Sequence, residues 1–265
     1  MKNIIEGSIR LLMDLIRTQS FSKEEDQTAE IIDTYLKDKG VERHRELNNV
    51  WAFNKYYDPS KPTILLNSHH DTVHPNKGYT KDPFNPEVTE DGKLYGLGSN
   101  DAGGCLVSLI GTFLHYYDKQ DLKYNFVIAA TAEEEISGLH GLEFVVPKLG
   151  DLEFAIVGEP TQMHLAVAEK GLMVLECKAP GKSGHAAREE GENAIYNAMK
   201  DIAWFQTYQF PKQSEMFGPI KMSVTMINAG TQHNVVPASC DFVVDVRITD
   251  AYTNQEVLDI IEANT

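Results

Sequence analysis

Four short segments of the sequence bring acidic or imidazole side chains to serine-, glycine- or proline-containing breaks. They are His69-His70-Asp71, 99–104, Glu133-Glu134-Glu135 and Gly158-Glu159-Pro160. The histidine segment ends an apolar stretch that begins at Leu65, and both glutamate segments also follow apolar stretches. Imidazole nitrogen and carboxylate oxygen are zinc ligands, and catalytic zinc sites keep one position open for water. The joint pattern therefore predicts a metal site.

Such a site could hydrolyse an amide bond. In two-metal hydrolases the ions lie about 3.5–4 Å apart, and bound metal lowers the pKa of water toward about 7. A free carboxylate beside the metals can act as general base and then as the acid for the leaving amine. Two adjacent glutamates at a strand end suit this chemistry, because one can face the metal and the other the water.

Each segment taken alone has a simpler interpretation. A single histidine is more often a surface or core residue than a ligand, residues 133–135 alone resemble a solvated charge run, and residues 158–160 alone resemble a turn. The metal site is favoured because most of these polar groups come just after a buried strand. A charge that is buried there must be paired or bound to a metal.

The elements that would position these segments alternate between strands and helices. The expected helices cover residues 1–17, 22–39, 103–117 and 141–146, and the expected strands cover 50–56, 63–67, 125–130 and 154–157. Ser22 and Glu25 have the form of a capping box at the start of the second helix. The pattern predicts an α/β fold with a mostly parallel sheet flanked by helices, in which sites form at the carboxyl ends of strands.

The pattern changes after about residue 165. Strands are expected over 166–179, 220–227 and 240–248, and helices over 193–205 and 254–263. This β-α-β-β-α order is that of a ferredoxin-like unit without its closing strand. We therefore predict two domains, a metal-binding domain over residues 1–168 and a smaller, incomplete one over 169–265.

Composition limits the partners. The 265 residues carry a formal net charge of −15, which disfavours nucleic acid and anionic membrane as partners. No apolar stretch approaches the roughly 18 residues that suggest a membrane span. The three cysteines, Cys105, Cys177 and Cys240, share no close spacing, so a reducing compartment and a cytoplasmic location are expected.

The four motifs in order resemble the co-catalytic zinc amidohydrolase family of acetylornithine deacetylase, succinyl-diaminopimelate desuccinylase and aminoacylase. The resemblance implies a zinc-peptidase-like catalytic domain, a lid domain, and two zinc ions that cobalt or manganese could replace. It implies the following site residues: His69 as a ligand, Asp71 orienting its ring, Asp101 as the bridging ligand before a cis peptide bond, Glu134 as general base, and Glu135 and Glu159 as further ligands. One metal would bind His69, Asp101 and Glu159, and the other would bind Asp101, Glu135 and one more histidine.

That last histidine is where the sequence departs from the family pattern. In the family it follows the return of the chain from the lid to the catalytic domain, and this sequence ends at Thr265. His164, His185 and His233 are the histidines that follow Glu159 in the sequence, and none has the expected motif. Two alternatives are open: either the sequence is a truncation with an incomplete lid, or the second metal binds weakly or not at all. In either case the 265 residues alone could be inactive.

The lid also contains family-like residues. His185 in Gly184-His185-Ala186 resembles the residue that stabilises the oxyanion in a partner subunit, which implies a homodimer. Asn234 resembles a substrate-contacting asparagine, and Arg247 resembles the residue that binds the substrate carboxylate. The simpler interpretations are an exposed turn histidine, a turn residue that opens a strand, and an ion pair on a strand.

The resemblance is greatest to the acetylornithine deacetylase branch. We therefore expect deacylation of a small N-acyl amino acid, such as N-acetylornithine, another N-acyl-ornithine or an N-acyl-citrulline, which would place the enzyme in arginine biosynthesis. Desuccinylase and dipeptidase activities use the same metal ligands and remain open. A non-catalytic homologue that binds metal or ligand without turnover is the alternative from a different class.

Overall fold

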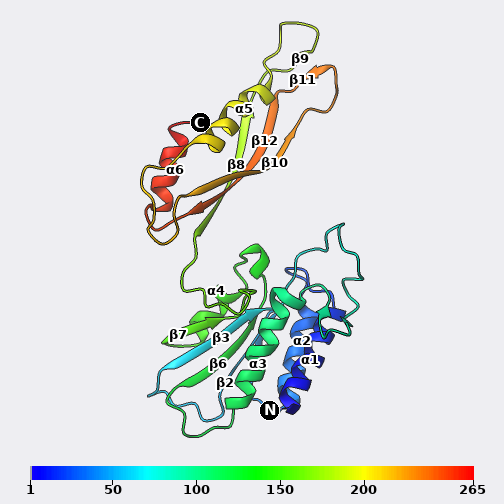
Figure 1. The fold of residues 1–265 in the computed structure, drawn as a ribbon, viewed down its shortest axis with the longest axis vertical. Helices are drawn as coiled ribbons and strands as arrows, with labels where there is room; N and C mark the ends of the chain where they lie inside the picture. The colour runs from blue at the N-terminus through cyan, green and yellow to red at the C-terminus, as the bar shows by residue number, and fades with distance from the viewer. Residues whose placement is uncertain (1) are drawn as a thin grey trace. The chain divides into compact units, whose positions relative to one another are not determined.

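The computed structural model describes residues 2–265, which form two compact units that divide between Leu165 and Ala166. The first unit is drawn from blue to green in Figure 1 and the second from yellow-green to red. Within the described residues, every helix is too short or too polar to cross a bilayer.

The first unit is built on a five-stranded mixed sheet in the order β1-β2-β6-β3-β7. The strands are β1 (His44–Glu46), β2 (Asn49–Phe53), β3 (Thr63–His69), β6 (Asn125–Thr131) and β7 (Phe154–Val157). β3 pairs in parallel with both β6 and β7, whereas β2 runs antiparallel to β6. A short ribbon of β4 (Glu87–Val88) and β5 (Leu94–Tyr95) interrupts the long loop that follows β3.

Helices cover both faces of this sheet, as the sequence predicts (Figure 1). On one face lie α1 (Lys2–Arg17), α2 (Asp26–Asp38) and α3 (Gly104–Tyr116); the other face carries α4 (Leu142–Val145) with a short 3-10 turn, η3 (Val146–Lys148). Alternate residues of β3 point to opposite faces of the sheet: Leu66 packs against α1, α2 and α3, and Leu65 packs on the face that α4 covers. The fully buried pattern of β3 follows from this double cover.

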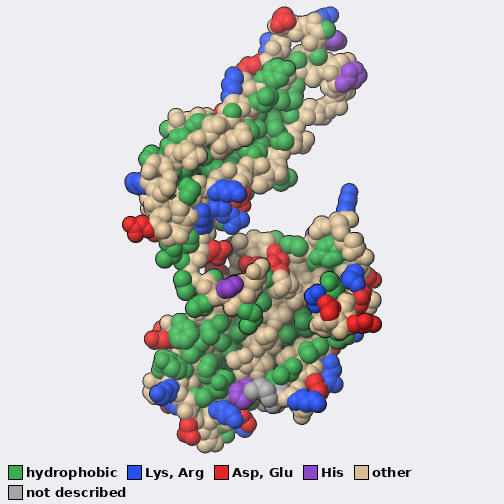
Figure 2. All heavy atoms as spheres, in the orientation of Figure 1, with side chains coloured by type: hydrophobic (Ala, Val, Ile, Leu, Met, Phe, Trp, Pro, Cys, Tyr) green, Lys and Arg blue, Asp and Glu red, His purple; other side chains and the backbone are tan. Residues whose placement is uncertain are grey.

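The edge strand β7 differs from β3 in its exposure. All four of its residues are exposed, among them Phe154, Ile156 and Val157. Figure 2 shows hydrophobic side chains at the surface of this unit on the side where Figure 1 draws β7.

The second unit has a three-stranded antiparallel sheet in the order β10-β12-β8. Its elements are β8 (Gly171–Pro180), β9 (Gly184–His185), α5 (Ala194–Thr207), β10 (Lys221–Ala229), β11 (Val235–Val236), β12 (Ser239–Ile248) and α6 (Asn254–Glu262). Alternate residues of β12, including Phe242, Val244 and Val246, are buried in a core with α5 and α6. Apart from the short β9–β11 ribbon, the order is the β-α-β-β-α expected from the sequence.

One local prediction is wrong. Ser22 and Glu25 do not form a capping box, because α2 begins at Asp26 and its N-cap residue, Glu25, makes no side-chain capping hydrogen bond. Ser22 instead donates to Asp71 Oδ2 at 2.7 Å. The true capping box of the chain opens α6, where Thr253 and Glu256 satisfy each other's backbone N–H groups.

Candidate metal centre

The parallel strands bring three of the polar segments to one edge of the sheet. His69 is the last residue of β3 and pairs with Thr131, the last residue of β6. Val157 ends β7 opposite Asn67 of β3. The residues that follow these strands, 70–71, 132–135 and 158–159, therefore emerge side by side. The carboxyl edge of such a sheet is where ligand sites of open α/β folds form.

His69 lies at the centre of this cluster and is only 1 % exposed. Its Nδ1 lies 3.2 Å from Asp71 Oδ1 and 3.0 Å from the backbone oxygen of Asp71. Its Nε2 faces three carboxylates, at 3.1 Å from Asp101 Oδ1, 3.7 Å from Glu134 Oε2 and 3.8 Å from Glu159 Oε1. Since Nδ1 is held by Asp71, Nε2 is the nitrogen that could bind a metal.

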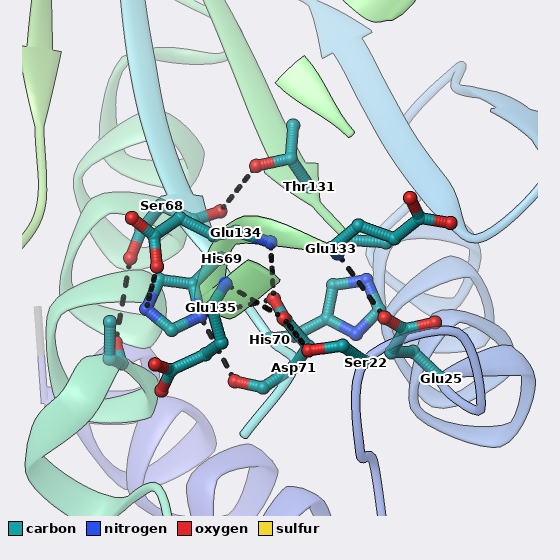
Figure 3. Close-up of polar contacts among 12 residues, drawn as sticks. Ser22, Glu25, Ser68, His69, His70, Asp71, Thr131, Glu133, Glu134 and Glu135 are labelled. Carbon is teal, nitrogen blue, oxygen red and sulfur yellow. Dashed lines mark hydrogen bonds and ion pairs between the residues drawn. The ribbon is translucent and has the colours of Figure 1, made fainter. Parts of the chain in front are cut away.

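Asp71 is fully buried and contacts more than the histidine (Figure 3). Its Oδ1 accepts a hydrogen bond from the backbone N–H of Glu134 at 3.1 Å, and its Oδ2 accepts one from the N–H of Glu135 at 3.1 Å. Together with the hydroxyl of Ser22, these donors satisfy a carboxylate that has no access to water. Asp71 thus fixes both the imidazole ring and the backbone of the glutamate pair.

Asp101 reaches the cluster from a separate element, the π-helical turn η1 (Ser99–Gly103) that precedes α3. The peptide bond between Asp101 and Ala102 is cis, which confirms the expectation from the sequence motif. Ala102 is buried, while the side chain of Asp101 is 54 % exposed. Gly103 permits this tight turn, because a Cβ there would lie 2.6 Å from the backbone oxygen of Gly98.

The glutamate pair lies on a 3-10 turn, η2 (Glu134–Ile136), directly after β6. The turn is bounded by two residues in the left-handed conformation, Glu133 with φ 56° and Ser137 with φ 50°. Non-glycine residues rarely adopt this conformation unless their surroundings hold them there. The side chain of Glu133 turns away from the cluster to His140, whose Nδ1 lies 3.3 Å from Glu133 Oε1. Glu134 and Glu135 are therefore the two glutamates that face His69 (Figure 3).

The crowding of negative charge changes the proton affinities of the site. Burial alone would lower the pKa of His69, but its hydrogen bond to Asp71 and the charges of Asp71, Glu159 and Glu134 outweigh burial and raise that pKa to about 9. Burial and the neighbouring carboxylates raise the pKa of Glu159 to about 7, against the opposing charge of His69. The same causes, burial first, raise the pKa of Glu135. Although burial opposes it, the hydrogen bonds from His69 and Ser22 lower the pKa of Asp71.

The donor set fits one or two divalent cations. Two overlapping groups have ligand atoms that all lie within 4.8 Å of one another; they are His69, Glu134 and Glu159, and His69, Asp101 and Glu135. A set of one imidazole and several carboxylates suits zinc, and it also suits manganese or cobalt. A bound cation would offset the mutual repulsion that raises the pKa of Glu159 and Glu135.

The side chains group differently from the assignment expected from the family. The two groups share His69, whereas the expected arrangement shares Asp101 between the metals. Glu134, expected to be the base, belongs to one of the groups. The division of roles between Glu134, Glu135 and Asp101 therefore stays a prediction.

The other three predicted site residues lie in the second unit. His185 and Asn234 are neighbours, because β9 pairs with β11 and the N–H of Ala186 donates to the backbone oxygen of Asn234 at 3.0 Å. Both side chains are exposed. The Arg247 guanidinium forms a two-bond ion pair with Asp245 on the same strand, at 2.9 and 3.1 Å, which is the simpler alternative that the sequence offered. His164 and His233 are exposed and belong to neither ligand group.

Known proteins resemble the chain in sequence. Residues 167–264 match the family model described as the peptidase dimerisation domain of the M20 family. The chain is 26 % identical over 277 residues to succinyl-diaminopimelate desuccinylase 2 of Ruegeria sp., which covers 97 % of this chain and 69 % of that protein. It is 33 % identical over 207 residues to the acetylornithine deacetylase of Proteus mirabilis, which covers 75 % of this chain and 53 % of that protein. The chain therefore spans only part of the length of these relatives.

Solved structures share the fold. An M20 family metallo-carboxypeptidase of Sulfolobus solfataricus superposes with a TM-score of 0.70 at 17 % identity, covering 97 % of this chain and 74 % of that one. A dinuclear metal-binding M20 peptidase of Bacillus subtilis gives a TM-score of 0.63 at 18 % identity, covering 99 % and 68 % of the two chains. The resemblance indicated by the four motifs is thereby confirmed: residues 167–264 match the M20 dimerisation domain, and the chain resembles M20 amidohydrolases and peptidases over most of its length.

Proposed function

We propose that the protein hydrolyses the amide bond of a small N-acyl amino acid with the help of two divalent cations at the centre around His69. The observation that carries the proposal is the convergence of one buried imidazole and four carboxylates at the carboxyl edge of β3, β6 and β7. The carboxylates are those of Asp101, Glu134, Glu135 and Glu159. Together with His69 they come from four separate segments, which a chance charge run on the surface would not bring together.

Two bound divalent cations would polarise the acyl carbonyl and lower the pKa of the attacking water. The residues of the chain would hold the cations, orient the ligands and transfer the proton. His69, Asp101, Glu135 and Glu159 would hold the cations, and Asp71 would keep the ring of His69 turned so that Nε2 faces them. Glu134, whose Oε2 lies 3.7 Å from His69 Nε2, would take the proton of the water and return it to the leaving amine. The products are a carboxylate and a free amine.

Within this class we propose N-acetylornithine, or a related N-acyl-ornithine or N-acyl-citrulline, as the substrate. The 33 % identity to an acetylornithine deacetylase supports this choice. A relative that matches along 97 % of the chain is named a succinyl-diaminopimelate desuccinylase, so N-succinyl-diaminopimelate is the second candidate. The zinc preference and the cytoplasmic location are parts of the same proposal, and three free cysteines are in keeping with a reducing compartment.

The match to a dimerisation domain supports a homodimer formed through the second unit. In such a dimer His185 would stabilise the oxyanion in the site of the partner subunit, and Asn234 would contact the substrate. Arg247 would have to leave Asp245 before it could bind a substrate carboxylate. Sedimentation of the purified protein tests the dimer directly.

The test of the reaction is a substrate panel for the complete encoded protein, loaded with zinc, manganese or cobalt. The panel contains N-acetylornithine, N-acetylcitrulline, N-succinyl-diaminopimelate and a dipeptide. Turnover of the ornithine or citrulline compound with two metals per chain is the expected result. Turnover of the succinyl compound alone would overturn the substrate choice, and no turnover of any compound would favour a non-catalytic homologue.

A further inference from the structure

A second buried carboxylate, that of Glu25, lies behind the glutamate pair and makes no contact with the ligand groups. The residue is 0 % exposed and precedes α2. Its Oε1 accepts hydrogen bonds from the backbone N–H of Lys23 at 2.7 Å and of Glu133 at 3.2 Å, and its Oε2 accepts one from Asn48 Nδ2 at 2.9 Å. These three donors, two backbone N–H groups and an amide, compensate its burial.

The bond from Glu133 places Glu25 at the corner where the chain leaves β6 for the site. Glu133 has a φ of 56°, a conformation that costs roughly 1 kcal/mol or more for a residue with a Cβ. Its backbone oxygen accepts a hydrogen bond from Gly138 at 2.8 Å, which closes the turn. The N–H that Glu25 binds belongs to the residue whose backbone angles set the direction of Glu134 and Glu135.

Glu25 and Asp71 together hold three consecutive backbone N–H groups. Glu25 binds that of Glu133, and Asp71 binds those of Glu134 and Glu135 (Figure 3). The two carboxylates are also linked, because Ser22, three residues before Glu25, donates to Asp71. Residues 20–25 therefore support the glutamate turn twice, directly through Glu25 and indirectly through the bond from Ser22 to Asp71. The Thr72 N–H, in the segment that follows β3, donates to the backbone oxygen of Ser20 at 2.8 Å and fixes these residues in place.

We infer that Glu25 is a positioning residue: through the backbone N–H of Glu133 it fixes the left-handed corner that directs the Glu134 and Glu135 carboxylates toward His69. Glu25 touches neither substrate nor ligand atoms. Its consequence for catalysis rests on the proposed function, but its effect on the turn does not. Loss of the Oε1 acceptor would leave the Glu133 N–H without its partner and would release the corner.

The first measurement is amide hydrogen exchange of the segment 132–138 in the metal-free chain. Glu25→Ala removes the acceptor and is expected to speed exchange of this segment by about tenfold or more. Glu25→Gln keeps an acceptor oxygen but turns a donor toward Asn48, so an intermediate effect is expected. The double variant Glu25→Gln/Asn48→Asp places a carboxylate acceptor at position 48 opposite the new amide donor at position 25. Its exchange rate is expected to return toward that of the wild type.

Two control variants separate positioning from general stability. Glu24→Gln removes the same charge from the adjacent, exposed residue. Ile32→Val trims a fully buried core residue of α2 that lies outside the site and lowers stability without touching the turn. Exchange is measured under conditions in which all variants stay folded. Both controls are then expected to leave exchange of the segment 132–138 at the wild-type rate.

The second measurement is zinc or manganese affinity by titration calorimetry. Residues that support metal ligands from behind commonly change metal affinity by about 10–100-fold, and a loss of about tenfold is expected for Glu25→Ala but not for the controls. If Glu25→Ala, or Glu25→Gln where the alanine variant fails to fold, matches the controls in both exchange and affinity, the inference is wrong. If the wild type neither binds metal nor hydrolyses any substrate, the proposed function fails, while the exchange measurement still decides the role of Glu25.

Discussion

Asp71 Oδ2 accepts hydrogen bonds from the backbone N–H of Glu135, at 3.1 Å, and from the hydroxyl of Ser22. Its other oxygen, Oδ1, faces His69 Nδ1. One buried side chain thus couples the orientation of the imidazole to the backbone position of Glu135, on the turn that follows a different strand. A change at Asp71 should therefore disturb both ligands at once.

We expect Asp71→Asn to weaken metal binding by about 10–100-fold, because the amide cannot accept hydrogen bonds through both of its arms. Calorimetric titration with zinc measures the loss. Asp38→Asn, an exposed aspartate near the end of α2, is the matched control and should bind metal as the wild type does. Equal affinity of the two variants would contradict the coupling.

Glu134→Gln separates the role of a base from that of a ligand. If Glu134 is the general base, the variant should lose about 100-fold or more in kcat, the usual range for such a group, with metal content unchanged. If it is a ligand through its group with His69 and Glu159, metal affinity falls with activity. Metal analysis beside kinetics distinguishes the two, and the exposed Glu143→Gln on α4 serves as the control.

Much of this site follows from the sequence, because His69 and the residues after 131 and 157 are placed by strands that are recognisable as short apolar runs. Parallel pairing of those strands then brings the segments together without further information. The expectation of a mostly parallel sheet flanked by helices, with a β-α-β-β-α unit after it, is confirmed for the same reason: periodicity and order are local signals.

The part that could not be predicted depends on tertiary contacts. Ser22 and Glu25 have the spacing of a capping box, and nothing local shows that their side chains instead reach Asp71 and Glu133. Both partners lie far away in sequence, so long-range hydrogen bonds replace the local ones that a capping box would make. For Arg247 the local signal was present, because Asp245 lies two residues away and thus on the same face of β12.

Metal binding should release protons. In the metal-free protein near neutral pH, His69 carries a proton because its pKa is about 9, and Glu159 is partly protonated because its pKa is about 7. A cation needs both groups deprotonated, so affinity should rise as the pH increases from about 6 toward about 9. Calorimetry in two buffers of different ionisation enthalpy counts the protons released. A binding heat that is independent of the buffer would contradict this prediction.

His70 should make the metal-free protein less stable in mild acid. Its side chain is buried, Nδ1 lies 2.9 Å from Thr28 Oγ1, and Nε2 lies 2.8 Å from the backbone oxygen of Asn48. Burial outweighs the hydrogen bond to Asn48 and the charge of Asp71, and it lowers the pKa of His70 to about 4.

An unfolded chain takes up this proton near pH 6.5, but the folded chain does so only near pH 4, so the unfolded state binds more protons between these values. The contribution of His70 to the free energy of unfolding is therefore fully present above about pH 6.5 and is lost as the pH falls toward 4, with a limit of about 3 kcal/mol. Urea unfolding at a series of pH values, with a chelator present, measures it. His70→Gln, which does not titrate, should remove this part of the slope and leave the part due to carboxylates, and identical slopes for the two proteins would show that His70 takes up its proton equally readily in both states.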